Sequence, residues 1–135
     1  MITTMTLTET TEAAATAIEF LEALGRRDFA EVASRLAPNV WLRVLLPRKV
    51  VETYDAEDAV AELQGWFGMA SDFQVLETDH HTVEGREFIR YRFLLRPDWA
   101  LGQKHVIEQT GFCRVKDGRI SRLDLVCTGF FPVTD

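Results

Sequence analysis

The apolar residues in the first half of the chain recur every three or four positions, a spacing typical of one face of an amphipathic helix. The clearest stretch predicts a helix over residues 13–24, which Gly25 ends. Its apolar face consists of Ala14, Ala17, Ile18, Leu21 and Leu24. The segment from Asp28 to Glu31 has the form of a capping box and predicts a second, short helix up to Pro38.

A third helix is predicted over residues 56–69. Val60, Leu63 and Phe67 share one face of this segment, and Asp55 can cap its first turn. All three predicted helices therefore fall in the first half of the chain.

From residue 73 onward the period changes from 3.6 to two, as in a β-strand with one buried face. The apolar residues of segment 88–96 point to one side and its arginines to the other. Strands are predicted over residues 40–46, 49–54, 73–83, 88–96, 103–115 and 119–129. We expect a hairpin turn at Glu84 and Gly85, and a three-residue loop at 116–118 with Gly118 in the left-handed conformation.

This alternation separates an inner, apolar face of the sheet from an outer, charged face. The inner face is predicted to contain Leu42, Val44, Ile89, Tyr91, Phe93, His105, Ile107, Gln109, Cys113, Leu123, Leu125 and Cys127. The outer face is predicted to contain Arg90, Arg92, Arg96, Glu108, Arg122 and Asp124. Because these charges are of both signs, we interpret the outer face as solvated or interfacial rather than as an anion site. Cross-strand ion pairs there should each contribute under about 1 kcal/mol.

Helices followed by a run of antiparallel strands predict an α+β architecture with the helices on one side of the sheet. The 135 residues are enough for one domain, and we expect residues 1–9 to form a flexible N-terminal extension. A long, strongly curved sheet wrapped around three helices leaves a cone-shaped interior. Such interiors commonly hold ligands, so we expect an enclosed apolar pocket.

Composition and charge restrict the classes of binding partner. A net charge of −6 argues against a nucleic-acid partner, which would require clustered basic residues. The sequence has no apolar run of the length of a membrane span or of a signal peptide, and we expect a cytoplasmic protein. Cys113 and Cys127 are too few for a disulfide framework or a zinc site. We interpret both as small buried apolar residues, with a catalytic thiol as the alternative.

Several segments resemble one known superfamily. These are residues 17–24 (AIEFLEAL), 25–29 (GRRDF), 36–40 (LAPNV) and 115–120 (VKDGRI). Together they resemble the nuclear-transport-factor-2-like superfamily, which includes ketosteroid isomerases, SnoaL-type polyketide cyclases, scytalone dehydratase and limonene epoxide hydrolase. The resemblance covers nearly the whole chain. It implies the cone-shaped fold and, by analogy, a homodimer formed through the outer face of the sheet.

The catalytic patterns of these relatives do not carry over. Ketosteroid isomerase requires a Tyr and two Asp residues, and Phe20, Val44 and Gly111 stand at those positions here. The Asp-Arg-Asp arrangement of limonene epoxide hydrolase fails as well, because Leu125 occupies the place of its second Asp. Asp124 is one residue away and should face outward. Any acid–base chemistry must therefore rest on a histidine.

Two histidines are candidates for that role. His105 shares the inner face with Gln109, and hairpin counting turns His80 inward from the triplet 79–81. Tyr91, also inward, could donate a hydrogen bond to a ligand oxygen. Further ligand contacts are expected from Tyr54, Trp41, Gln64, Trp66, Phe93, Ile107, Leu125 and Cys127. In the alternative interpretation each His is only hydrogen-bonded to a neighbour and the aromatic residues only fill the core.

Three hypotheses of function follow. The first is an enzyme of the SnoaL or ketosteroid-isomerase type, which catalyses a cofactor-independent isomerisation, cyclisation or dehydration of a small hydrophobic molecule without a metal. The second is a non-catalytic ligand-binding or accessory protein of the same fold. The third is a structural dimerisation module with a solidly packed interior.

Overall fold

The computed structural model describes residues 4–134, and side chains from residue 12 onward. The three expected helices are present as α1 (Thr4–Gly25), α2 (Phe29–Ser34) and α3 (Ala56–Phe67). Helix α1 begins earlier than predicted, so most of the expected N-terminal extension is helical, and residues 1–3 lie outside the described residues. The threonine-rich start of α1 has no apolar repeat that would have indicated a helix.

The helix caps form as the sequence predicts, with one difference. Asp55 accepts a hydrogen bond from the backbone N–H of Asp58 at 2.8 Å, and Asp28 accepts one from the N–H of Glu31 at 3.1 Å. The Glu31 carboxylate, however, binds Arg35 at 2.7 Å. Helix α2 ends at Ser34 and not near Pro38, because the chain from Leu36 onward is already a strand, in which Leu36 pairs with Ile120.

Seven strands form one sheet, whose main path has the order β2-β1-β6-β5-β4-β3. Strands β1 and β6 run parallel, and all other neighbours are antiparallel. The strands are β1 (Leu36–Leu46), β2 (Lys49–Thr53), β3 (Ser71–Val83), β4 (Arg86–Arg96), β5 (His105–Lys116), β6 (Arg119–Cys127) and β7 (Phe131–Pro132). The short 3₁₀-helix η1 (Asp98–Ala100) lies between β4 and β5, and β7 pairs with the start of β5.

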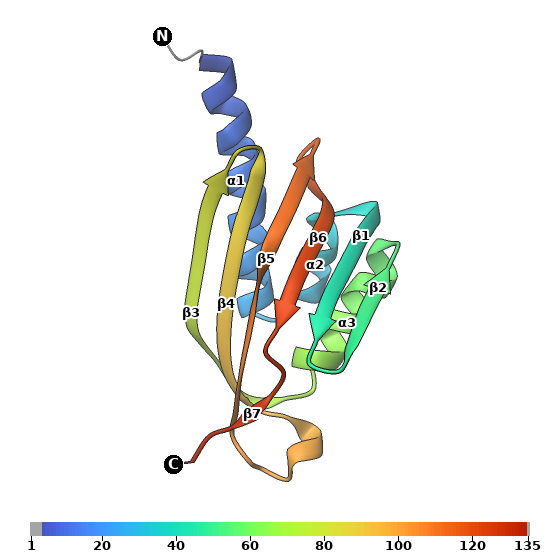
Figure 1. Cartoon of the computed structure of the whole chain (residues 1–135), viewed down its shortest axis with the longest axis vertical. Coiled ribbons are helices and arrows are strands. Elements are labelled where there is room, and N and C mark those ends of the chain that lie inside the picture. The colour runs from blue at the N-terminus through green and yellow to red at the C-terminus, as the bar shows by residue number, and fades with distance from the viewer. Residues whose placement is uncertain (1–3, 135) are drawn as a thin grey trace.

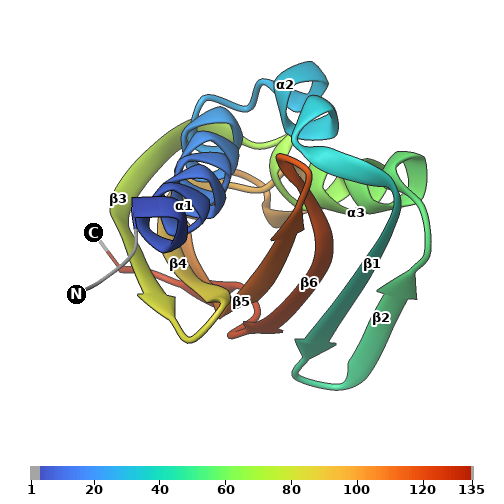
Figure 2. The ribbon, with the colours of Figure 1, turned by 90° about the horizontal axis from the view of Figure 1, so that it is seen from above.

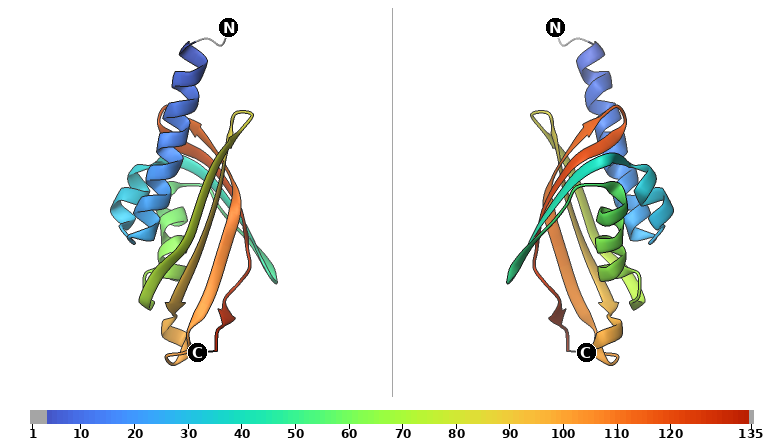
Figure 3. Two further views of the ribbon diagram at one scale, coloured as in Figure 1. Left: turned by 90° about the vertical axis from the view of Figure 1, so that its left-hand side faces the viewer. Right: turned by 90° about the vertical axis from the view of Figure 1, so that its right-hand side faces the viewer.

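The sheet curves around the helices, which all lie on its concave side (Figures 2 and 3). Helix α1 crosses the sheet near β3, and α3 lies near β1 (Figure 2). The N-terminal end of α1 and the β3–β4 and β5–β6 hairpins are at one end of the molecule, with η1 and β7 at the other (Figure 1). This is the predicted α+β cone.

The β3–β4 turn and the β5–β6 turn each contain two residues with positive φ. Glu84 and Gly85 have φ values of 43° and 79°, and Asp117 and Gly118 have values of 53° and 76°. Such pairs suit tight hairpins because their twist matches that of the flanking strands. The predicted three-residue loop at 116–118 is therefore wrong by one residue, because Lys116 pairs directly with Arg119.

Strand β3 is the least regular strand. It forms one edge of the sheet, and its pairing with β4 shifts register twice, between Ser71 and Gln74 and again between Val75 and Glu77. Most of its side chains are exposed, in contrast to the strict alternation of β4.

The core lies between the concave face and the helices. All predicted inner-face residues are buried, and Phe67, Phe73, Tyr91 and Phe93 form an aromatic cluster with ring centroids 4.6 to 6.4 Å apart. Aromatic pairs in this range stabilise a core beyond their buried area. The centre of the cone is thus closely packed with side chains.

Candidate functional site

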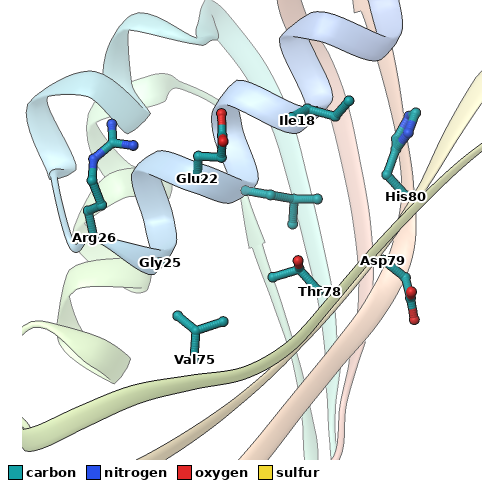
Figure 4. A pocket seen from close by; sticks show the side chains of 9 residues that line it. Ile18, Glu22, Gly25, Arg26, Val75, Thr78, Asp79 and His80 are labelled. Atoms are coloured by element: carbon teal, nitrogen blue, oxygen red, sulfur yellow. The ribbon is translucent and has the colours of Figure 1, made fainter.

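A groove runs between α1 and the inner side of β3 (Figure 4). Its volume is about 470 Å³, within the range of small-molecule sites. It is lined by Ile18, Leu21, Glu22, Gly25, Arg26, Val75, Thr78, Asp79 and His80. Gly25 allows the helix to approach the strand closely, since a Cβ atom there would lie 3.1 Å from Cγ2 of Val75. The groove offers an apolar surface, with half-exposed Ile18 and Val75, at the edge of the sheet.

His80 forms the polar end of this groove. Its Nε2 lies 2.7 Å from Oε1 of Glu87, and Thr82 donates a hydrogen bond of 2.8 Å to the same oxygen. The side chain of Glu87 is 2% exposed, whereas that of His80 is 17% exposed. In the neutral imidazole, an Nε2–H that donates to Glu87 leaves Nδ1 as the proton acceptor.

Cys113 packs in the same region of the inner face. Burial, together with the negative charge of Glu87, raises the pKa of this thiol from 9.0 to about 12. A cysteine nucleophile reacts as its thiolate. The structure therefore disfavours a catalytic thiol at this position.

Tyr91 and Gln109 form a buried pair deeper in the cone. The Tyr91 hydroxyl donates a hydrogen bond to Oε1 of Gln109, and Nε2 of Gln109 is buried without a partner among the described residues. Burial raises the pKa of Tyr91 well above its ordinary value, as does the neighbouring Cys127. Tyr91 therefore keeps its proton and can act as a hydrogen-bond donor.

His105 faces inward, as predicted, but at the other end of the molecule. It pairs with Leu95 of β4, whereas His80 pairs with Ile89. Six residues of strand separate those partners, or roughly 20 Å. The Nδ1 of His105 lies 2.9 Å from the carbonyl oxygen of Gln103, and its ring packs edge-on against Trp99. One small ligand cannot reach both histidines.

Two aromatic residues predicted to contact ligand lie outside the cone. Tyr54 is 65% exposed, and its hydroxyl donates to Glu52 at 2.9 Å. The ring of Trp41 lies on the outer face beneath the guanidinium of Arg122, at 4.2 Å, because its neighbour Leu42 faces inward. Neither side chain faces the interior, and a contact of either residue with a ligand stays a prediction.

Two further predicted ligand contacts, Gln64 and Trp66, lie on α3. Gln64 is exposed, since the buried face of α3 consists of Ala59, Leu63 and Phe67, and its contact with a ligand stays a prediction. Trp66 is half-buried and packs edge-on against Phe67. The remaining predicted contacts, Phe93, Ile107, Leu125 and Cys127, are buried on the inner face as expected, and their role in binding stays a prediction.

Glu87 is a candidate site residue that the predicted strands do not include. It lies two positions before Ile89, so the period of two places it on the inner face. The predicted strand began one residue later, at Phe88, and the carboxylate was left outside the pattern. An acidic residue in step with an apolar face is the signal that could have identified it.

The described residues, 4–134, contain no group of three or more His, Cys, Asp and Glu side chains placed to hold a metal ion. None of their helices has the length and apolar character needed to cross a bilayer.

Comparisons with known proteins bear on the fold. Neither protein-family models nor curated proteins match the sequence. Solved structures match well. An epoxide hydrolase of the LEH-like type from M. tuberculosis has a TM-score of 0.67 at 20% identity, over 88% of this chain and 84% of that one.

Two other structures match equally well. A candidate ketosteroid isomerase from Kribbella flavida has a TM-score of 0.67 at 20% identity, over 93% and 84% of the two chains. A candidate polyketide cyclase from Xanthomonas campestris has a TM-score of 0.68 at 18% identity, over 86% and 90%. The shared class is an α+β cone with helices on the concave side of a curved sheet. NTF2-like proteins from Burkholderia also match, and this chain has the nuclear-transport-factor-2-like fold.

Proposed function

We propose that this protein is a cofactor-independent acid–base enzyme for a small hydrophobic molecule, which it isomerises, cyclises or dehydrates. The observation that supports this most is the buried Glu87 carboxylate bound to His80 at the polar end of an apolar groove. A carboxylate behind an imidazole fixes the ring and stabilises its protonated form after it accepts a proton. The related structures described as an isomerase and a cyclase lend support at the level of the fold.

In this proposal the apolar body of the substrate lies against Ile18, Leu21 and Val75. His80 removes a proton from a carbon next to a carbonyl group and returns it elsewhere on the substrate. Tyr91 and Gln109 are proposed to hold the carbonyl oxygen together: Nε2 of Gln109 is the unused donor, and Tyr91 fixes the amide through its hydrogen bond to Oε1. They reach the substrate only if the aromatic cluster shifts, because both are now fully buried.

The alternative is a ligand-binding protein without chemistry. The close packing around Tyr91 and Gln109 favours it, as does the absence of the carboxylates used by ketosteroid isomerases. It predicts that a bound ketone is recovered without exchange of its protons.

A proton-exchange assay separates the two. Small cyclic ketones are incubated in D₂O, and loss of their α-proton signals is followed by NMR. Proton abstraction by His80 predicts that His80→Gln lowers the protein-dependent exchange rate at least about a hundredfold, the usual contribution of general-base catalysis. His81→Gln should retain the rate, because His81 is exposed on the other face of the same strand. Equal rates in the two variants would contradict the assignment of His80.

A further inference from the structure

The outer face of the sheet has a hollow of about 320 Å³ that is lined by four arginines. They are Arg43, Arg86, Arg114 and Arg122, and the other lining residues are Phe112, Cys113 and Asp124. Asp124 is the only acidic residue among them. The whole chain has 21 acidic and 15 basic residues, so the local charge is opposite to that of the molecule.

Three of these arginines are neighbours across three strands. Arg114 of β5 pairs directly with Arg122 of β6. Glu87 of β4 pairs with Cys113 of β5. One position further along this antiparallel pair, Arg86 lies beside Arg114. Like charges directly opposite each other destabilise a sheet by up to about 1 kcal/mol per pair. An anion bound between them would remove this repulsion.

The existing carboxylate neutralises only part of this charge. Asp124 binds both Arg43, at 3.1 Å, and Arg122, at 2.7 Å. The guanidinium of Arg86 lies 5.7 Å from the ring centre of Phe112. Within residues 4–134, neither Arg86 nor Arg114 has a carboxylate partner.

A second group of arginines on the same face is balanced. Arg90 and Arg92 share Glu77 and Glu108, and Arg90 also binds Asp79. The outer face, which the sequence predicts to carry charges of both signs, therefore divides into an ion-paired network and a basic hollow.

We propose that this hollow binds the phosphate group of a small phosphorylated molecule. Guanidinium groups hold phosphate oxygens through paired, charge-assisted hydrogen bonds, and Arg86 and Arg114 have donors available for them. The volume suits a small molecule, and Phe112 supplies an apolar wall for its organic part. The site lies on the opposite side of the sheet from the groove at His80 and does not depend on the function proposed for that groove.

Inorganic pyrophosphate is the probe for a titration calorimetry test at constant ionic strength. The variant is Arg114→Gln, since Arg114 has no ion pair to lose. The matched control is Arg48→Gln, which removes the same charge from an exposed position in the β1–β2 turn. We expect Arg114→Gln to weaken pyrophosphate binding at least about tenfold, as for a lost charged hydrogen bond, and the control to change it less than about twofold.

Thermal unfolding provides a second measurement. Without pyrophosphate, Arg114→Gln should be at least as stable as the original protein because a repulsive charge is gone. With pyrophosphate, the original protein should gain more in melting temperature than the variant. Equal binding by protein and variant, or equal losses in Arg114→Gln and Arg48→Gln, would overturn the proposal. An absence of pyrophosphate binding to the original protein would also overturn it, and a dimer that Arg114→Gln dissociates would then show that the hollow contacts a second copy.

Discussion

At the scale of single residues, the buried Glu87 affects two neighbours in different ways. It holds His80 by a hydrogen bond at the groove. Its negative charge, together with burial, raises the pKa of Cys113. A charged carboxylate in an apolar setting needs partners, and His80 and Thr82 both supply hydrogen bonds. The same carboxylate that binds His80 thus helps to keep the Cys113 thiol protonated.

The raised pKa of Cys113 predicts a loss of stability at alkaline pH. In the unfolded chain the thiol ionises near 9.0, whereas in the folded protein it holds its proton to about 12. The unfolded state therefore binds fewer protons from about pH 9 upward, and the free energy of unfolding should fall by about 1 kcal/mol between pH 9 and pH 10 and by about 1.4 kcal/mol per pH unit above that. Urea unfolding at pH 9 and pH 10 measures this slope. Cys113→Ala should flatten it, and an unchanged slope in that variant would refute the assignment.

The inward turn of His80 could be predicted from sequence, because the Glu84–Gly85 turn fixes which residues of β3 and β4 face each other. The lining of the groove could not. It depends on how closely α1 approaches β3, which is set by the packing around Gly25 and not by any pattern along either segment.

At the scale of elements, β5 leaves no room for a side chain at Gly111, where it lies against β6. A Cβ atom at this position would lie 1.7 Å from the backbone oxygen of Asp124. No side chain can move aside to relieve that clash, since the neighbouring atom belongs to the backbone. Gly111 also occupies the place of a catalytic Asp in the ketosteroid-isomerase pattern, so restoring an acid there is not compatible with this strand spacing.

Gly111→Ala should therefore destabilise the protein strongly. We expect a loss of at least about 3 kcal/mol, at the upper end of the cost of overpacking. Gly65→Ala is the control, because a Cβ on this α3 residue meets nothing within 4 Å and alanine favours a helix by up to about 1 kcal/mol. This account predicts a denaturant midpoint below that of the original protein for Gly111→Ala and above it for Gly65→Ala. A Gly111→Ala variant as stable as the original would contradict it.

Which strand residues face inward was predicted well where the period of two is regular. Strands β4, β5 and β6 confirm it from Ile89 to Cys127. Trp41 is an exception. The period of two turns Leu42 inward and Trp41 outward, which conflicts with the expectation that aromatic residues near a cavity contact its ligand.

At the scale of the whole molecule, Arg27 connects three separate elements. It follows α1, adopts a positive φ of 56°, and donates hydrogen bonds to the carbonyl oxygens of Phe67, at 3.1 Å, and Ala70, at 2.6 Å. Its guanidinium also lies 4.8 Å from the ring centre of Phe73 in β3. A positive charge at the end of α3 is favourable because the helix dipole is negative there.

Arg27→Gln should weaken the attachment of α3 to α1 and β3. Loss of the charged hydrogen bonds predicts a decrease of about 2 to 3 kcal/mol in the free energy of unfolding. Arg26→Gln, at the exposed neighbouring position, should change it by less than about 0.5 kcal/mol. Chemical denaturation measures both, and similar values for the two variants would exclude this role for Arg27.

The overall architecture could be predicted because its determinants are local: three helical repeats, tight turns and a regular alternation in β4 to β6. The shape of the interior could not, because it depends on how large side chains such as Phe67 and Phe93 interlock across elements distant in sequence. The expected central pocket remains a prediction, and the groove at the sheet edge is the cavity that the structure offers for it.

The irregular pairing of β3 has a further consequence for how the protein behaves at high concentration. An edge strand with a regular hydrogen-bonding pattern can recruit strands from other molecules and start open-ended aggregation. The two register shifts at the start of β3 interrupt that pattern, and charged residues such as Asp72, Glu77 and Asp79 discourage a second strand from aligning. The irregular start of β3 would therefore help the molecule to remain dispersed.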